Sequence, residues 1–397
     1  MALYAFQLGR KHFLCAAELE AVLGVENLVE KSNYTAIFEL ENLADFATGN
    51  SPAQDLQDRL GGTIKIIEIT HQISASKIDN KALEPDIEDL ITTHFSDAQG
   101  KTPFAITTLG FGRHSSIYIK KLLNFSKKIL KDIGGNCRFV NKDERNPKPS
   151  TIYKAKVIEK GIDINILKGE NTTYLGKSIA IQNINDYSKR DFDKPGRDAR
   201  VGMLPPKLAQ IMLNLTNSKP NSTIYDPFCG TGTTLMEAML VGHDVVGSDI
   251  SRRMVDFTER NCRWLSENFN TQQNFRVFER DACFITQGCL QEEIDTIVTE
   301  GYLGNPVSKL PSDHEREVTF RQLANMHLNW LRAVNPLLPE KARIVTCTAV
   351  FRHKNFIEHL PRFKEIANNA GYKIIETYTY DRPDQVVARD IQVLEKY

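Results

Sequence analysis

The sequence lacks the features that mark secreted, zinc-binding and membrane-spanning proteins. Its seven cysteines are scattered and never form a C-x-x-C pair, which indicates neither a disulfide framework nor a metal site. No run approaches the roughly 18–20 apolar residues that a membrane-spanning helix requires. The first ten residues also lack the charged leader and apolar core of a secretory signal. We therefore expect a soluble, cytoplasmic protein that binds no metal and no membrane.

Two familiar nucleotide-binding fingerprints are also missing. The dinucleotide pattern G-x-G-x-x-G fails because Leu235 occupies the third glycine position, and the Gly-Lys-Ser/Thr of a P-loop is absent. What the chain has is Asp226-Pro-Phe-Cys-Gly-Thr-Gly232, between a predicted strand and a predicted helix. Its plain reading is an ordinary glycine-rich turn. Gly230 and Gly232 would also let the backbone lie against a ligand, at a helix start whose N–H groups are free.

The chain is long enough for two or three domains, because a single core stops growing near ~250–300 residues and this sequence has 397. Short amphipathic segments in the first half predict two α+β units. Their strands are expected at residues 3–8, 34–40, 63–69, 102–108, 162–167 and 178–182, and their helices at 15–23, 53–60, 85–94 and 118–133. The charged stretch 186–200, interrupted by proline and glycine, is the best candidate for a domain boundary.

After residue 203 strands and helices alternate, which predicts an α/β fold with a doubly wound parallel sheet. Strands are expected at 223–225, 244–248, 275–279, 295–299 and 342–348, and helices at 233–241, 252–267, 319–334 and 355–370. The last two β-rich runs, 373–380 and 389–394, predict a terminal hairpin. A terminal antiparallel strand is typical of the methyltransferase form of this sheet and not of the dinucleotide-binding form.

Four successive strand ends carry glycine or acidic residues. Asp249 follows the second strand and is placed to accept the ribose hydroxyls of an adenosine-containing cofactor. Asp281 and Ala282 follow the third strand, where a side chain can receive an adenine amino group. Thr299-Glu-Gly-Tyr-Leu-Gly304 follows the fourth strand, on the side from which a substrate approaches. Taken singly, Asp249 and Asp281 are more typical of helix caps or solvated turn residues.

These residues resemble the THUMP-domain RNA methyltransferases, specifically those that methylate guanine N2 at position ten of tRNA. The resemblance is carried by Asp226–Gly232, by the stretch 197–209 and by Tyr187-Ser-Lys-Arg-Asp191. It implies a ferredoxin-like unit at 1–62, a THUMP-like RNA-binding module at 63–183, a linker at 184–202 and a Rossmann-like class I methyltransferase domain at 203–397. The implied cofactor is S-adenosylmethionine, with these binding residues: Leu204, Asp226, Phe228, Gly230, Thr231, Gly232, Asp249, Ile250, Asp281 and Ala282.

The resemblance breaks at the catalytic strand end. The family has Asp-Pro-Pro-Tyr, whose acid and carbonyls accept hydrogen bonds from an exocyclic amine while the aromatic ring stacks on the base. This chain has Glu300-Gly-Tyr-Leu303 instead, so Glu300, Gly301 and Tyr302 are the candidate catalytic residues. Three alternatives stay open: a catalytically inactive RNA-binding relative, a DNA amino-methyltransferase and, least favoured, a nicotinamide oxidoreductase.

Positive charge is concentrated in one part of a chain whose total is balanced. Residues 111–160 hold thirteen Lys and Arg against four Asp and Glu, whereas the whole sequence has 50 of each class. The plain reading is a solvated surface. In a THUMP-like module the charge favours contact with RNA phosphates, most plausibly of a tRNA, and an accessory subunit stays open. The candidate RNA-binding residues are Lys120, Lys121, Lys127, Lys128, Lys131 and Lys154.

Overall fold

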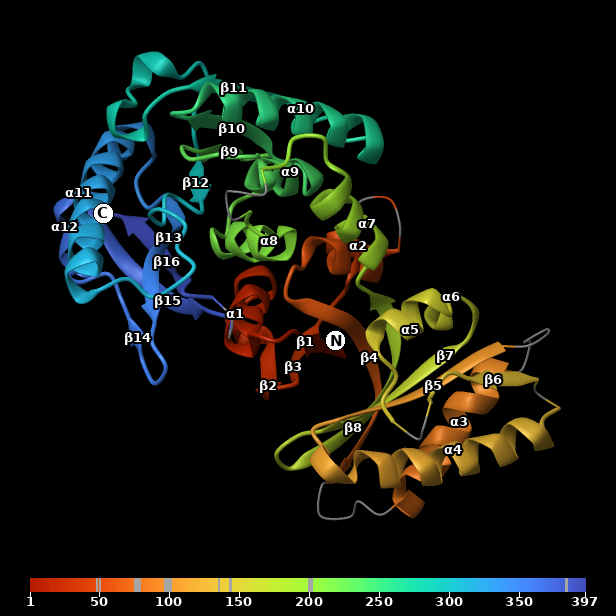
Figure 1. Ribbon diagram of the computed structural model, residues 1–397. Helices are drawn as coiled ribbons and strands as arrows, with labels where there is room; N and C mark the ends of the chain where they lie inside the picture. The colour runs from red at the N-terminus through yellow and green to blue at the C-terminus, as the bar shows by residue number, and fades with distance from the viewer. Residues whose placement is uncertain are drawn as a thin grey trace. The chain divides into compact units, whose positions relative to one another are not determined.

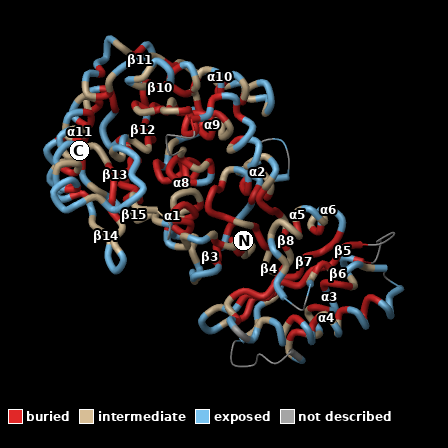
Figure 2. The backbone as a smooth tube through the Cα atoms, viewed as in Figure 1, coloured by how far each residue is buried: buried red, intermediate tan, exposed pale blue. Residues whose placement is uncertain are grey.

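The computed structural model describes residues 1–47, 49, 51–74, 80–95, 102–134, 136–142, 145–198, 203–382 and 385–397. The chain divides into two compact units, Met1–Asn185 and Asp186–Tyr397 (Figure 1). Each unit has one sheet whose central strands are buried (Figure 2). Among the described residues, no helix combines the length and the apolar character needed to cross a bilayer.

The first unit is built on an eight-stranded sheet with the order β2-β3-β1-β4-β8-β7-β5-β6. Its strands are β1 (Ala2–Leu8), β2 (Leu28–Lys31), β3 (Thr35–Leu40), β4 (Thr63–Ser74), β5 (Thr102–Leu109), β6 (Cys137–Phe139), β7 (Ile162–Lys168) and β8 (Thr172–Ile181). Its helices are α1 (His12–Leu23), α2 (Pro52–Arg59), α3 (Asn80–Phe95), α4 (Ser115–Asp132), α5 (Pro149–Lys154) and α6 (Val157–Lys160). Every predicted strand and helix of this half is confirmed, whereas β2, β6, α5 and α6 were not predicted.

One sheet runs through both halves of this unit. β4 pairs antiparallel with β1 on one side and with β8 on the other. The predicted limit between residues 62 and 63 therefore falls between two strands of a continuous sheet. The division into a unit of 1–62 and a module of 63–183 stays a prediction.

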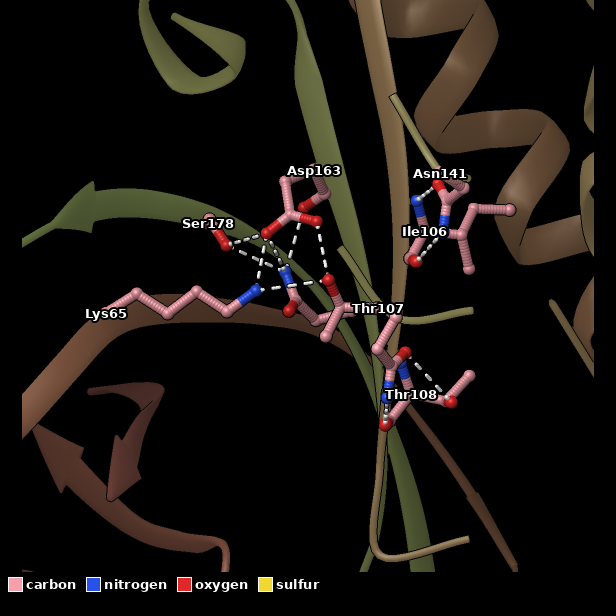
Figure 3. Close-up of polar contacts among 9 residues, drawn as sticks. Lys65, Ile106, Thr107, Thr108, Asn141, Asp163 and Ser178 are labelled. Carbon is pink, nitrogen blue, oxygen red and sulfur yellow. Dashed lines mark hydrogen bonds and ion pairs between the residues drawn. The ribbon is translucent and has the colours of Figure 1, made fainter. Parts of the chain in front are cut away.

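Side-chain amides complete the free edge of β5 where its short neighbour β6 ends. Asn141 accepts from the Ile106 N–H at 3.0 Å and donates to the Ile106 carbonyl at 2.8 Å (Figure 3). Two residues further along β5, Asn146 makes the same pair of hydrogen bonds with Thr108, at 2.8 and 2.7 Å. Because an open edge exposes a row of unpaired backbone groups, these two amides replace a strand that β6 is too short to supply.

A polar cluster is sealed inside the same sheet. The Lys65 amine donates to Asp163 at 2.5 Å and to Thr107 at 3.3 Å, and Thr107 donates to the other Asp163 oxygen at 2.9 Å (Figure 3). Ser178 donates to Asp163 at 2.6 Å, and Asn165 donates to Ser178 at 2.8 Å. All five side chains are buried. The cluster joins β4, β5, β7 and β8, so it fixes how these four strands lie side by side.

The second unit confirms the predicted α/β methyltransferase fold. Its sheet has the order β11-β10-β9-β12-β13-β16-β15, parallel from β11 to β13 and antiparallel at β16 and β15. The strands are β9 (Thr223–Asp226), β10 (Asp244–Asp249), β11 (Phe275–Glu279), β12 (Thr296–Thr299), β13 (Arg343–Arg352), β15 (Tyr372–Tyr380) and β16 (Val387–Lys396). Helices α8 (Pro206–Leu215), α9 (Thr233–Leu240) and α10 (Arg252–Phe269) lie on one side, and α11 (Asp313–Val334) and α12 (Phe363–Asn369) on the other (Figure 1).

Two helix predictions in this unit are wrong in extent, and α8 was not predicted. The helix expected at 355–370 begins only at Phe363, because Pro361 cannot sit inside a helix and β14 (Ile357–Glu358) precedes it. α11 begins six residues before its predicted start. Its N-terminus is fixed by a capping box, in which Ser312 and Glu315 bond each other's backbone N–H groups.

Candidate cofactor and substrate site

The glycine-rich turn is held open in a conformation that favours glycine. Gly230 and Gly232 have φ angles of +54° and +79°, and a Cβ on Gly232 would approach Thr258 Cγ2 to 2.8 Å. Helix α10 fixes the turn from behind, since the Thr258 hydroxyl donates to the Gly230 carbonyl at 2.8 Å. Asn261, one turn further along α10, donates to the Thr231 carbonyl at 2.7 Å. Sequence reasoning missed both supports, although polar residues on the buried face of α10 were a signal.

Asp226 lies beneath this turn and is itself buried. One carboxylate oxygen accepts from the Phe228 N–H at 3.0 Å, and the side chains of Thr299 and Thr234 also bond the carboxylate. Burial raises the pKa of Asp226 to about 7, with the nearby Asp249 adding to the shift. Asp226 therefore supports the turn from within the sheet and links it to the end of β12 through Thr299.

Asp249 ends β10 and contacts the turn directly. Its two oxygens accept from the N–H groups of Gly230, at 3.0 Å, and of Ser251, at 2.9 Å. Burial raises the pKa of this carboxyl, and the two N–H donors oppose the shift. The next residue, Ile250, is 69% exposed, although apolar side chains of this size are usually covered. The Asp249 carboxylate and the exposed Ile250 side chain therefore follow each other in the chain, beside the glycine-rich turn.

The other predicted cofactor residues differ in burial and in the contacts that they make. Asp281 follows β11 and caps a short 3₁₀ helix (Ala282–Phe284) by accepting from the Cys283 N–H at 2.8 Å, which is the structural role weighed for it from the sequence. Ala282 and Leu204 are buried, and Phe228 packs edge-on against Trp330 with ring centroids 5.7 Å apart. The strand pairing brings the ends of β9, β10 and β11 to one edge of the sheet.

Glu300 follows β12 and is held by Arg389, a residue that sequence reasoning missed. The guanidinium of Arg389, on β16, engages Glu300 Oε1 through both Nε and Nη2. Burial raises the pKa of Glu300, whereas the positive charge of Arg389 opposes the shift. A signal was present in the sequence, because Arg389 and Asp390 are two adjacent charges within an otherwise mostly apolar strand.

The segment after Glu300 turns sharply. Gly301 has a φ angle of +68°, and its N–H donates to the Thr299 hydroxyl at 3.0 Å. Proline, with φ fixed near −65°, cannot adopt this conformation. Tyr302 is 45% exposed, and its hydroxyl donates to Asn305 at 2.8 Å. The chain therefore presents an acid and an exposed aromatic ring at this strand end, on either side of a turn that favours glycine.

The segment predicted as a linker packs on the helix that follows the glycine-rich turn. α7 (Ile184–Ser188) and a single π-helical turn (Lys189–Asp193) lie within it. Arg190 donates to Glu237 of α9 at 2.7 Å, and both side chains are buried. Lys194 donates to Thr233, the first residue of α9, at 2.8 Å. Residues 199–202 of the predicted linker lie outside the described residues.

Five of the six candidate RNA-binding lysines lie on α4, and the sixth, Lys154, lies on α5. Lys120, Lys121, Lys127, Lys128 and Lys131 are all exposed on α4, as their spacing predicted. The buried side of α4 packs with Phe104 and Ile106 of β5, whereas α5, which carries the exposed Lys154, packs with Ala105. Successive residues of a strand point to opposite faces. The structure therefore places Lys154 on the face opposite the α4 lysines.

No cluster of three or more His, Cys, Asp or Glu side chains suited to a metal ion occurs in the described parts of the chain. All seven cysteines are free thiols, and four of them are buried.

Comparison with known proteins relates the second unit to methyltransferases. A family model described as RMKL-like, methyltransferase domain, matches residues 196–306. The tRNA (guanine(10)-N2)-dimethyltransferase of Methanocaldococcus jannaschii is 25% identical over 352 residues, which cover 85% of this chain and 94% of that enzyme. The enzyme of the same name from Methanothermobacter thermautotrophicus is 37% identical over 142 residues, covering 36% of this chain and 38% of that enzyme.

The likeness of fold extends over the whole chain. The crystal structure of TrmN from Thermus thermophilus superimposes with a TM-score of 0.55 at 15% identity, covering all of both chains. The first unit thus has the same fold as the corresponding part of TrmN.

Proposed function

We propose that this protein, a methyltransferase homologous to the tRNA guanine-10 N2 methyltransferases, transfers a methyl group from S-adenosylmethionine to the exocyclic N2 amine of a guanosine in tRNA. The observation that carries the proposal is that the glycine-rich turn, the Asp249 carboxylate bonded to it and Glu300 lie at the same edge of the sheet. The relatives' substrate supports the choice of tRNA.

The residues around the turn fit an adenosyl cofactor. A Cβ on Gly230 would meet only the Phe228 carbonyl oxygen, at 3.9 Å, so the space in front of this glycine is open. Asp249 is placed to accept ribose hydroxyls, and the exposed Ile250 offers an apolar face for the adenine. When bound, S-adenosylmethionine supplies an electrophilic methyl group on its sulfonium. The chain's own contribution is to hold this group and the amine in line.

The strand end after β12 fits an amine. Arg389 occupies Glu300 Oε1, and no described residue donates to Oε2, which is left to accept a hydrogen bond from the guanine N2 amine. The exposed ring of Tyr302 is available to stack on the base. Orientation of the amine by these two side chains aligns its lone pair with the methyl group, and positioning of this kind supplies much of a catalytic rate. The proton that N2 loses when its bond to the methyl carbon replaces the carbon–sulfur bond passes to Glu300 Oε2, the oxygen that accepts its hydrogen bond.

The first unit supplies the attraction for the tRNA in this proposal. The five lysines of α4 form an exposed basic face that can neutralise phosphates without reading sequence. The ferredoxin-like unit at 1–62 and the THUMP-like module at 63–183 are proposed on the family resemblance and on the full-length likeness to the TrmN fold.

The test uses the full chain with methyl-labelled S-adenosylmethionine and unmodified tRNA transcripts. We expect label in tRNA with guanosine at position ten and none when inosine, which lacks the N2 amine, replaces it. Mass spectrometry of the nucleosides would identify one or two methyl groups on N2. Equal labelling of the inosine transcript would contradict the choice of amine. Binding of cofactor and tRNA without transfer to any RNA would show the catalytically inactive relative instead.

A further inference from the structure

We infer that Arg389 is a positioning residue for Glu300: it keeps the side chain as a carboxylate and directs one of its oxygens, Oε2, toward the substrate amine. The inference rests on the proposed function, since it names how the acceptor of the amine hydrogen bond is prepared. Neither the family resemblance nor the motif around Glu300 points to Arg389, which lies 89 residues further along the chain.

The strand order explains how Arg389 reaches Glu300. β13 lies between β12 and β16, and Arg389 is paired with Ala349 of β13. Its side chain crosses β13 and places Nε and Nη2 on the same carboxylate oxygen. Arg389 is 7% exposed, so its charge is little screened by solvent. Arg389 is thus a buried residue of the terminal hairpin, and its guanidinium is held more firmly than that of an exposed surface arginine.

The contact is one-sided, and it lies directly after the carboxyl end of a strand, where a substrate can reach the second oxygen. Both donors of Arg389 go to Oε1, while no described residue donates to Oε2. A carboxylate has about four lone-pair positions and seeks several donors when it is buried. Glu300 is therefore held firmly through one oxygen with its second oxygen left for an external donor.

The contact between Arg389 and Glu300 also suits a chain that has Glu300-Gly-Tyr where the family motif given above has Asp-Pro-Pro. A glutamate reaches one methylene further than an aspartate and has one more rotatable bond, and Gly301, with φ at +68°, excludes a rigid proline after it. Arg389 removes the added freedom of the longer side chain, and the Gly301 N–H bound to Thr299 fixes the backbone. Two contacts thus replace the rigidity that prolines supply in the family motif.

The positive charge of Arg389 affects the protonation of Glu300. Burial raises the pKa of Glu300, and Arg389 is the group that opposes this rise. Without the arginine, a larger share of Glu300 would be protonated at a given pH. A protonated carboxyl is a weaker acceptor for an amine hydrogen, so the acid limb of the pH–rate profile would move to higher pH.

Other titratable groups around the pair do not obscure that shift. Burial raises the pKa of the Cys347 thiol on β13, which therefore stays neutral, and Asp390 and Tyr380 lie on the strands of the terminal hairpin. Asp226, with a pKa of about 7, titrates within the assay range. Because Asp226 is present in both the wild type and an Arg389 variant, the difference between their profiles reports Glu300.

The experiment compares Arg389→Met and Arg389→Lys with the wild type at saturating S-adenosylmethionine and tRNA. For Arg389→Met we expect kcat to fall about 100-fold, as for the loss of one aligned electrostatic contact, with the acid limb moved to higher pH. For Arg389→Lys we expect the limb near its wild-type position but a reduced kcat, because a lysine keeps the charge and loses the planar fork. Cofactor affinity, measured by calorimetry, should stay within about twofold, since the arginine does not contact the cofactor cradle.

A matched control separates positioning from stability. Arg316 makes a comparable ion pair with Glu358, between α11 and β14, that includes neither Glu300 nor Arg389. Arg316→Met should lower the melting temperature without moving the acid limb. An Arg389→Met protein that keeps the wild-type kcat and acid limb would overturn the inference while the proposed function stands.

A second readout does not depend on methyl transfer. NMR titration of carboxyl-labelled glutamate, with the Glu300 signal assigned by its loss in Glu300→Gln, should give a higher pKa in Arg389→Met than in the wild type. An unchanged titration would overturn the inference even if the protein is active. A wild-type chain that methylates no RNA but shows the NMR shift would instead count against the proposed function alone.

Discussion

Two ion pairs, one taken from each unit, use similar chemistry in opposite ways. In the first unit Asp163 receives hydrogen bonds from Lys65, Thr107 and Ser178, so both of its oxygens are satisfied inside the sheet. In the second unit Glu300 receives Arg389 on one oxygen only and lies at a strand end beside an exposed tyrosine. We call the Lys65–Asp163 pair closed, because both carboxylate oxygens have donors, and the Arg389–Glu300 pair open, because only one oxygen has them among the described residues. We therefore base the proposed site on the free oxygen of Glu300 at a strand end and not on the burial of a charge alone.

The position of each acid in its strand explains the difference. Asp163 is the second residue of β7, covered by neighbouring strands on both sides. Glu300 comes directly after β12, where the sheet stops supplying neighbours and the backbone turns at Gly301. In open α/β sheets, ligands bind outside the carboxyl ends of the strands.

The largest effect is expected from opening the closed pair. Asp163→Ala would leave the Lys65 charge buried without its partner, and breaking such a pair costs about 3–5 kcal/mol of the free energy of unfolding. Chemical denaturation followed by circular dichroism would measure the loss. The double change Lys65→Met with Asp163→Leu should cost less, because it leaves no unpaired charge. An unchanged stability of Asp163→Ala would remove the basis for calling this cluster structural.

The next effect concerns the cofactor side of the open site. Asp249→Ala removes a charged acceptor of ribose hydroxyls, and hydrogen bonds to a charged group contribute about 1.5–3 kcal/mol, or about 10- to 100-fold in affinity. Calorimetry with S-adenosylmethionine would measure it. Asp163→Asn, in the closed cluster, serves as a control that should bind the cofactor normally. If Asp249→Ala binds S-adenosylmethionine with wild-type affinity, the cofactor does not bind at Asp249 and the glycine-rich turn.

A smaller effect is expected at the turn after Glu300. Gly301→Ala should destabilise the protein by about 1–2 kcal/mol, because a Cβ is disfavoured at φ +68°. Gly301→Pro should be worse than alanine, since proline cannot reach this φ. Thermal melting and methyl transfer would be compared for the two variants. Higher activity of Gly301→Pro would show that the turn is not needed for function.

The smallest effect is expected on tRNA affinity. Changing Lys127 and Lys128 to alanine should weaken binding and lower the slope of log affinity against log salt by about 1 for each phosphate that the lysines no longer neutralise. Lys154→Ala, on the opposite face of the sheet, is the matched control with one exposed lysine removed. Filter binding over a range of salt would measure both. Equal losses from the two faces would contradict an RNA surface confined to α4.

The fold was predictable where one segment of sequence decides it. Glycine or acid directly after short apolar runs predicted the ends of β9 to β12, and the final β-rich runs predicted the hairpin. Features that depend on distant partners were not predictable in this way. Arg389 is brought to Glu300 by strand order, and Asn141 replaces a strand by a side-chain contact, neither of which leaves a periodic pattern. The late start of α12 was readable from Pro361, and the early start of α11 from Ser312 and Glu315.

The amides that cover β5 make this edge sensitive to chemical ageing of the protein. Asn141 and Asn146 each donate to one backbone carbonyl and accept from one N–H group. Hydrolysis of the Asn141 amide to aspartate would leave an acceptor that cannot donate, so its oxygen would face the carbonyl oxygen of Ile106. Asn146 is protected, because Pro147 after it lacks the backbone N–H through which deamidation proceeds. The strand would then lose its cover and offer a template to a second chain, so deamidation would convert a finished edge into a starting point for aggregation.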